Sequence, residues 1–258
     1  MFEDFDLRER PITAEHVLRV CQEWHDQEVA DGETELEDPL TFQSKIAEWR
    51  DADEVGTWRN LARAMNGYWS ISVPKAEWKA VLCPAGKRTL GGVCELIARH
   101  AKVAEIPDVT ILGRRCREAG AFLAVRKILT DAGANSEEIT PSTSLDRYAK
   151  RYGRVFNGPI RKLAPGMLPA VRVDHPIYNF TNYGIGITFL FVGFSFLVGD
   201  PWLKAIAISL LVVFWFGSYL ATLLPPRRVA IGDLRTFRDL ANALAANEPT
   251  QSTAVRYL

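Results

Sequence analysis

Two long apolar stretches near the end of the chain dominate its hydrophobic pattern. Residues 176–199 contain no charged side chain over 24 positions, and residues 205–226 contain none over 22. At about 1.5 Å per residue each stretch would form a helix of roughly 33 Å, enough to cross the ~30 Å hydrocarbon core of a bilayer. Only residues 200–204 separate them. The pattern predicts a two-helix transmembrane hairpin over residues 176–226, and a buried hairpin in a soluble core is the less favoured alternative.

The rest of the chain shows the 3.6-residue periodicity of amphipathic helices. A helix is predicted after Thr13, further helices over residues 40–49 and 55–65, and others after Pro74 and Thr89. Residues 116–132 are predicted to form a strong amphipathic helix, and residues 105–113 have the composition of an extended linker. The fold class predicted from this pattern is all-α, with helical cytoplasmic domains and a two-helix transmembrane hairpin.

Charge orients the predicted hairpin. Basic side chains gather before and after it, so the positive-inside rule places both termini in the cytoplasm of a bacterium and the hairpin in its inner membrane as a multi-pass anchor. These side chains would form a collar that attracts anionic lipid head groups. The predicted membrane-interface collar is Arg147, Lys150, Arg151, Arg154, Arg161, Lys162, Arg172, Arg227 and Arg228.

The two ends of the chain carry opposite charge. Residues 1–57 hold 17 acidic and 5 basic side chains, a net charge of −12, and the remainder carries +12. Because the basic part flanks the predicted hairpin, we interpret the asymmetry as orientation at a membrane and expect no nucleic-acid partner. No signal peptide is expected at the N-terminus, and the four cysteines are expected to be reduced.

Small residues in the predicted spans are candidates for close helix packing. The small residues that would let helices approach closely are Gly184, Gly186, Gly193 and Ser195 in the first span and Ala205, Ala207, Ser209, Gly217, Ser218 and Ala221 in the second. Gly186, Gly193 and Gly217 are the leading candidates. Contact within the hairpin is favoured over contact with the spans of a partner protein, although self-association or a membrane-protein partner stays open.

Candidate chemistry is sparse. Cys21, His25 and Glu28 share a helix face at a spacing that metal ligands use, but a solvated helix end explains this isolated group better. The chain has no nucleophile elbow, P-loop, dinucleotide-binding glycine pattern or zinc-protease motif. The predicted spans carry no charge that would indicate an ion path. We therefore expect no enzymatic activity, no metal site and no cofactor.

Two segments resemble parts of an acyl carrier protein. Residues 119–145 contain a helix ending in Arg-Lys-Ile-Leu-Thr-Asp-Ala-Gly, followed by the loop Ser-Glu-Glu-Ile-Thr-Pro-Ser-Thr-Ser-Leu. Residues 229–246 contain Ala-Ile-Gly-Asp-Leu at 230–234, which is similar to the start of that family's last helix. The resemblance implies a small four-helix domain that is split by the transmembrane hairpin. The whole arrangement also resembles uncharacterised bacterial two-span membrane proteins.

The segments that resemble an acyl carrier protein lack the residue that a carrier needs for its chemistry. A working carrier needs a serine at the start of its second helix to hold the phosphopantetheine arm, and residues 147–177 contain neither Ser nor Thr. Residues 88–98 resemble the last-helix pattern as well, which implies that the first domain is a more degenerate unit of the same kind, ending near His100.

The predicted organisation follows from the hairpin and the resemblance together. Its parts are an N-terminal helical domain (1–105), the first part of the split domain (106–172), the hairpin (176–226), the last helix of the split domain (227–247) and a flexible tail (248–258). The predicted function is a non-enzymatic membrane anchor or docking protein, such as a scaffold or accessory subunit of a membrane complex. The alternative is a binding protein of lipid or acyl metabolism that uses a carrier-like fold.

Overall fold

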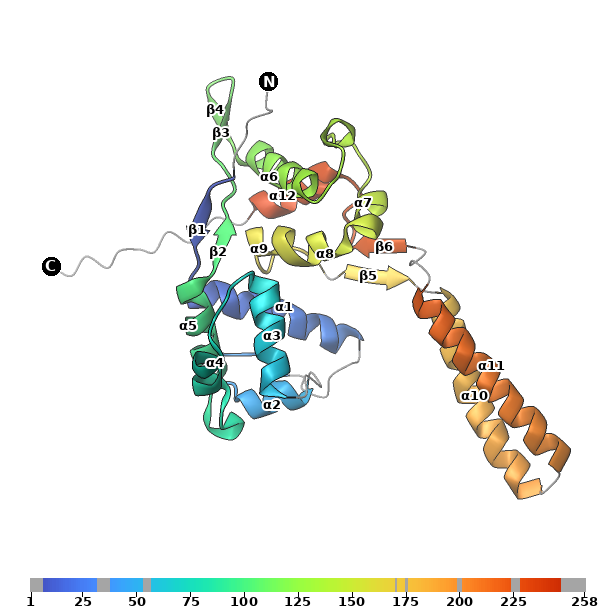
Figure 1. Ribbon diagram of the computed structural model, residues 1–258. Coiled ribbons are helices and arrows are strands. Elements are labelled where there is room, and N and C mark those ends of the chain that lie inside the picture. Colours follow the sequence, from blue (N-terminus) through green and yellow to red (C-terminus); the bar gives the residue numbers. More distant parts are fainter. Residues whose placement is uncertain are drawn as a thin grey trace.

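The chain folds into a mostly helical body from which a pair of helices projects (Figure 1). The computed structural model describes residues 7–31, 38–52, 57–169, 171–174, 176–198, 201–223 and 228–246. Two separate hydrophobic cores divide the body into two units. The predicted tail over residues 248–258 lies outside the described residues.

The first unit surrounds a core to which tryptophans contribute strongly. Trp49, Trp69 and Trp78 are buried, and α1 packs against α5. The predicted helices at 40–49 and 55–65 begin later than expected, at Ile46 and Trp58. Before Ile46 the chain forms a turn, in which the amide of Thr41 donates to Ser44 Oγ at 2.8 Å. The helices are α1 (Ala14–Asp31), α2 (Ile46–Ala52), α3 (Trp58–Trp69), α4 (Lys75–Leu82), the 3₁₀ turn η1 (Ala85–Lys87) and α5 (Leu90–His100).

The second unit packs its first helix, α6, against its last, α12. The predicted helix at 116–132 is confirmed as α6, with Cys116 at its N-cap. Its elements are α6 (Arg117–Asp131), η2 (Ser136–Glu138), α7 (Leu145–Arg151), α8 (Gly153–Val155), the π-helical turn η3 (Phe156–Ile160), α9 (Arg161–Leu163) and α12 (Phe237–Ala245).

Short antiparallel strand pairs join these parts, and only the strand at Val109–Ile111 falls wholly inside the predicted extended linker over residues 105–113. The first pair lies at the two ends of the first unit, the second starts within the predicted linker and ends beyond it, and the third lies at the base of the projecting helices (Figure 1). The pairs are β1 (Glu9–Pro11) with β2 (Lys102–Ala104), β3 (Val109–Ile111) with β4 (Arg114–Cys116), and β5 (Val171–Asp174) with β6 (Arg228–Ile231).

The last helix begins later than predicted. Residues 229–236 were expected to be helical, but Val229 and Ile231 lie in β6, where both side chains are buried against the second core. Alternating β-branched residues favour a strand, and Gly232 at φ +50 turns the chain out of it. α12 then starts with a capping box, in which the Thr236 hydroxyl accepts from the amide of Asp239 and the carboxylate of Asp239 accepts from the amide of Thr236.

The first unit holds its second and last helices together through a cross-link of backbone hydrogen bonds. The amide of Leu90 donates to the carbonyl of Ser44 at 2.9 Å, and the amide of Gly91 donates to the carbonyl of Phe42 at 3.0 Å. In the opposite direction, the amide of Ile46 donates to the carbonyl of Arg88 at 3.0 Å. The starts of α2 and α5 are therefore fixed against each other.

The second unit repeats this cross-link bond for bond. The amides of Phe237 and Arg238 donate to the carbonyls of Thr143 and Pro141 at 3.1 and 2.8 Å. The return bond runs from the amide of Leu145 to the carbonyl of Arg235 at 2.9 Å. The two units thus share one local geometry. Thr236 corresponds to Thr89 in this alignment, whereas the sequence pattern placed the repeat several residues earlier.

Candidate membrane hairpin and its attachment to the body

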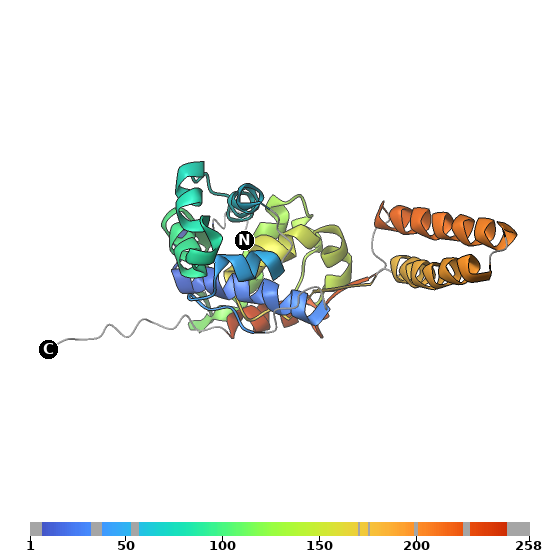
Figure 2. The same cartoon turned by 90° about the horizontal axis from the view of Figure 1, so that it is seen from below.

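α10 (Pro176–Val198) and α11 (Pro201–Leu223) form a hairpin that packs along its own length and leaves the body at β5 and β6. Both views show it projecting from one side of the body (Figures 1 and 2). α11 contains a stretch, Pro201–Leu220, that is long and apolar enough to cross a membrane. The apolar stretch described for α10, Tyr183–Val198, is shorter, because the side chains of residues 176–182 are outside the description.

The hairpin has its large apolar side chains on the outside. Leu197 is 87% exposed and Trp215 is 71% exposed, and much of the outer surface is similarly apolar. Other exposed members of this surface are Ile187, Phe189, Leu190, Phe194, Phe196, Trp202, Ile206, Val212, Val213, Phe216, Tyr219 and Leu220. A contiguous apolar surface of this kind is rare on proteins surrounded by water.

The inside of the hairpin is built from small and hydroxyl-bearing residues. Thr188, Ser195, Ala207 and Ser218 are buried between the helices. The Thr188 hydroxyl bonds to the carbonyl of Gly184 at 2.9 Å, so a polar group is satisfied within its own helix. Small buried residues with large apolar residues outside are typical of helices that pack within lipid.

Of the small residues predicted to allow close packing, Gly184 lies in the contact between α10 and α11, whereas Gly186 and Gly193 do not. A side chain at Gly184 would overlap the ring of Phe214 on α11, so this glycine is the close-approach point between the helices. A Cβ added at Gly186 or Gly193 would meet no heavy atom within 4 Å, so neither lies in the hairpin contact. Gly217 is half-buried. Packing of Gly186 and Gly193 against another molecule stays a prediction.

The predicted basic collar is not one continuous surface in the structure. Arg147, Lys150, Arg151 and Arg154 are exposed on α7 and α8. The backbones of Arg172 and Arg228 lie in β5 and β6 at the base of the hairpin, whereas Arg227 lies outside the described residues. Arg161 and Lys162 are only 4% and 8% exposed, and they face the first unit instead of lipid.

Arg161 and Lys162 are buried because α1 and α3 of the first unit pack over them. Arg161 Nε lies 3.7 Å from Glu23 Oε2, and both side chains are almost completely covered. Lys162 Nζ donates to the carbonyl of Tyr68 at 2.6 Å and lies 4.3 Å from the centre of the Tyr68 ring. This hydrogen bond pairs a carbonyl in the last turn of α3, and the positive charge of Lys162 is favourable at the C-terminal end of a helix.

Two further contacts attach α1 to the segment that leads into the hairpin. The amide of Gly166 donates to Glu23 Oε1, and the amide of Val171 in β5 donates to Gln27 Oε1 at 3.0 Å. Glu23 and Gln27 are four residues apart and therefore lie on one face of α1. The first unit is thus bonded to the approach to the hairpin, and we call these contacts the α1 clamp (Glu23, Gln27, Arg161, Lys162).

Burial shifts the pKa values of the clamp. Burial raises the pKa of Glu23 to about 7, opposed by the hydrogen bond from Gly166 and the charge of Arg161. Burial also lowers the pKa of Lys162 to about 8. His16 is in the same interior, where burial and the charges of Arg10, Arg19 and Lys162 lower its pKa to about 4. All three pKa shifts have the same main cause, which is that burial removes water from the charged form of each group.

The sequence reasoning missed this clamp. Its signal was present as a polar stripe on α1, because His16, Glu23 and Gln27 recur at seven- and four-residue spacing beside the apolar stripe. A polar stripe on a helix usually faces water. The stripe on α1 is buried only because the second unit packs against it, which the sequence of α1 does not show.

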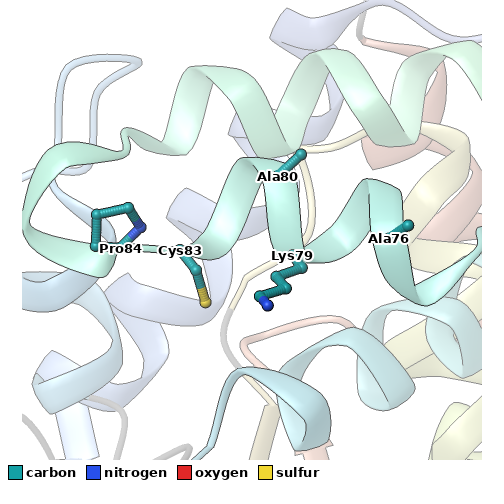
Figure 3. Close-up of a pocket in the computed structure, with 5 residues that line it drawn as sticks. All are labelled: Ala76, Lys79, Ala80, Cys83 and Pro84. Atoms are coloured by element: carbon teal, nitrogen blue, oxygen red, sulfur yellow. The ribbon is translucent and has the colours of Figure 1, made fainter.

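The remaining candidate features offer little chemistry. A surface hollow of about 570 Å³ on α4 is lined by Ala76, Lys79, Ala80, Cys83 and Pro84 and is almost entirely apolar (Figure 3). His25, expected at a solvated helix end, is buried, and its Nε2 lies 3.0 Å from the carbonyl of Asp38. In the described ranges, no three His, Cys, Asp or Glu residues form a group that could hold a metal ion.

Comparison with protein-family models, curated proteins and solved structures finds no match to this chain.

Proposed function

We propose that the protein is a non-enzymatic integral membrane protein whose α10–α11 hairpin crosses the bilayer twice. The observation that carries the proposal is the reversed polarity of the hairpin, with large apolar side chains outside and small or hydroxyl-bearing residues inside. Lipid removes the cost of exposing those apolar side chains, and hydroxyls bonded within their own helix satisfy the requirement for paired polar groups.

The helical body is proposed to lie on the cytoplasmic side, in a bacterium at the inner membrane. Support comes from the basic side chains on both sides of the hairpin in the sequence. There the two units would act as a docking or assembly surface for other membrane proteins. The α1 clamp would hold that surface in a fixed orientation relative to the bilayer, because it bonds the first unit to Gly166 and β5.

Topology is tested with reporter fusions in bacterial cells. Alkaline phosphatase is active only outside the cytoplasm, so it should be active when inserted at Asp200 and inactive when attached after Leu258. Green fluorescent protein should give the opposite pattern. Release of the intact chain from membranes by alkaline carbonate would contradict the proposed span.

The docking role is tested by native mass spectrometry of the chain purified gently from its own membranes. Partner proteins at a fixed ratio are the expected result. A lone chain that carries an acyl or lipid mass would instead support the alternative function in acyl metabolism. A monomer without any bound partner or lipid would contradict both roles, and only the function of a membrane anchor would remain.

A further inference from the structure

α7 and α8 present a basic face to the surroundings. Lys150, Arg151 and Arg154 are all exposed on this face, while Leu145 and Tyr148 on the opposite side are buried in the second core. Lys150 and Arg151 end α7 and Arg154 follows in α8 after a break at Tyr152, so the three cations lie within five positions on the exposed surface of this segment. We call them the basic face.

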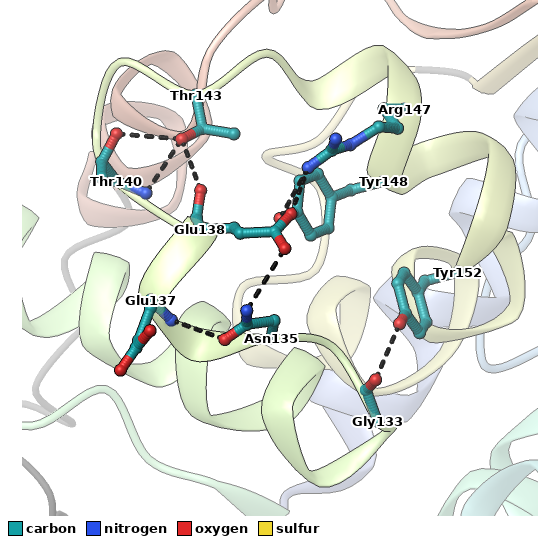
Figure 4. Close-up of polar contacts among 9 residues, drawn as sticks. All are labelled: Gly133, Asn135, Glu137, Glu138, Thr140, Thr143, Arg147, Tyr148 and Tyr152. Atoms are coloured by element: carbon teal, nitrogen blue, oxygen red, sulfur yellow. Dashed lines mark hydrogen bonds and ion pairs between the residues drawn. The ribbon is translucent and has the colours of Figure 1, made fainter.

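The described acids around this face form no ion pair with its three cations, although the Arg151 guanidinium also lies over the ring of Tyr152, 5.4 Å from its centre. Glu138 is already engaged with Arg147, whose Nη2 lies 2.6 Å from Glu138 Oε2 (Figure 4). Asp146, in the first turn of α7, is exposed, and its amide bonds to Ser144. No ion pair is formed by Lys150, Arg151 or Arg154 with any described residue. The face therefore keeps a surplus of positive charge.

The helix that carries the face is held firmly. The Tyr152 hydroxyl donates to the carbonyl of Gly133 at 3.0 Å, and the Asn135 side chain connects to Glu138 at 3.2 Å (Figure 4). Arg147 lies over the ring of Tyr148, 5.2 Å from its centre. The direction of the basic face is thus fixed by the loop before α7 and does not depend on a flexible arm.

The face lies close to where the chain leaves the proposed bilayer. α7 packs on β6, and five peptide steps separate the end of α11 at Leu223 from Arg228, a reach of at most about 17 Å. In both views α7 is on the side of the body from which the hairpin projects (Figures 1 and 2). Charges within roughly one Debye length, ~8 Å at physiological salt, of lipid phosphates are attracted to them.

We propose that Lys150, Arg151 and Arg154 dock on the phosphate groups of anionic lipids in the same leaflet that the hairpin enters. This inference rests on the proposed membrane function and adds a lipid class as the partner. The anionic head groups supply the charge that the basic face lacks, and the hairpin keeps them at high local concentration. Docking would give the body a second attachment to the bilayer besides β5 and β6.

The test compares the full chain with a Lys150→Gln/Arg151→Gln/Arg154→Gln variant in neutral detergent. Phosphatidylglycerol is titrated in, and native mass spectrometry gives the apparent affinity for the first bound lipid. The variant should bind it on the order of a hundredfold more weakly, because each of the three charges near anionic lipid contributes about a fivefold factor. Phosphatidylcholine should not distinguish the two proteins.

The matched control removes the same charge elsewhere. Lys75, Lys79 and Lys87 are exposed on the first unit, and a Lys75→Gln/Lys79→Gln/Lys87→Gln variant should keep the original affinity. Equal phosphatidylglycerol affinity in all three proteins would overturn the inference. So would displacement of the lipid by inorganic phosphate at equal concentration, which would identify a soluble anion as the ligand.

Failure of this inference and failure of the membrane function give different results. The same preparations are reconstituted into vesicles and extracted with alkaline carbonate. If the chain stays in the vesicles but shows no preference for phosphatidylglycerol, only the proposed lipid docking is contradicted. If the chain is extracted, the proposed membrane span is contradicted as well.

Discussion

At the scale of single residues, the basic side chains before the hairpin differ in their burial and therefore in what they contact. Arg161 and Lys162 belong to the same basic run as Lys150 and Arg154 in the sequence. The first pair is buried against Glu23 and the carbonyl of Tyr68, while the second pair is exposed. Buried charges need a partner, and here the first unit provides it.

Glu23 gives a pH-dependent prediction. Its pKa rises from 4.5 to about 7 on folding, so the folded chain holds this proton more tightly than the unfolded chain. Its contribution to stability is full below about pH 4.5 and is lost as the pH rises through 7, up to about 3 kcal/mol. Glu23→Gln cannot titrate, and the difference in unfolding free energy between the two proteins should therefore change across this window.

The measurement is unfolding of both proteins in mild detergent from about pH 5 to about pH 8. His16 acts in the opposite direction, because its lowered pKa makes folding more favourable as the pH rises from about 4 to 6.5. Only the difference between the two proteins isolates Glu23. Glu95→Gln, at an exposed site on α5, is the control. Parallel pH profiles for wild type and Glu23→Gln would contradict the assignment.

At the scale of elements, periodicity predicted the helices better than the strands. The long helices α1 and α6 follow from apolar residues at helical spacing, and α1 also follows the predicted N-cap Thr13. β5 and β6 are four residues each and 54 positions apart between their paired residues Asp174 and Arg228, so neither could be recognised from local pattern. Pairing across the hairpin converts residues 228–231 from expected helix to strand.

The hairpin contact gives a prediction with an internal control. Gly184→Leu would drive a side chain into Phe214 and should destabilise the hairpin by about 1–3 kcal/mol, as overpacking usually does. Gly186→Leu faces open space and should leave the stability unchanged. Both variants are measured by unfolding in mixed micelles of mild detergent and dodecyl sulfate. Equal loss in both would show that Gly186 packs against a second molecule.

At the scale of the whole molecule, two similar helical units are joined, and the second admits the hairpin between α9 and α12. The paired strands β5 and β6 close the second unit at the point of insertion, because Val229 and Ile231 contribute to its core. The body should therefore keep both cores without the hairpin. The matched cross-links relate the two units to each other, while the resemblance to acyl carrier proteins stays a prediction.

Replacing residues 175–227 with Asn-Gly tests this independence. Asp174 and Arg228 are paired in register, so a two-residue turn that favours hairpins should join them directly. The shortened chain is expected to be soluble without detergent, to keep helical circular dichroism and to unfold cooperatively. An aggregated product, or one without a cooperative transition, would show that the hairpin is needed to form the second unit.

The sequence by itself determined the apolar hairpin, the helical character of the body and the excess of positive charge around the hairpin. These depend on composition and on local periodicity, which every short segment carries with it. Only the tertiary structure decided which basic residues are exposed, which glycine contacts Phe214 and which polar face of α1 is buried. Those outcomes depend on contacts between segments up to 144 positions apart, as between Gln27 and Val171, and no local pattern encodes such a neighbour.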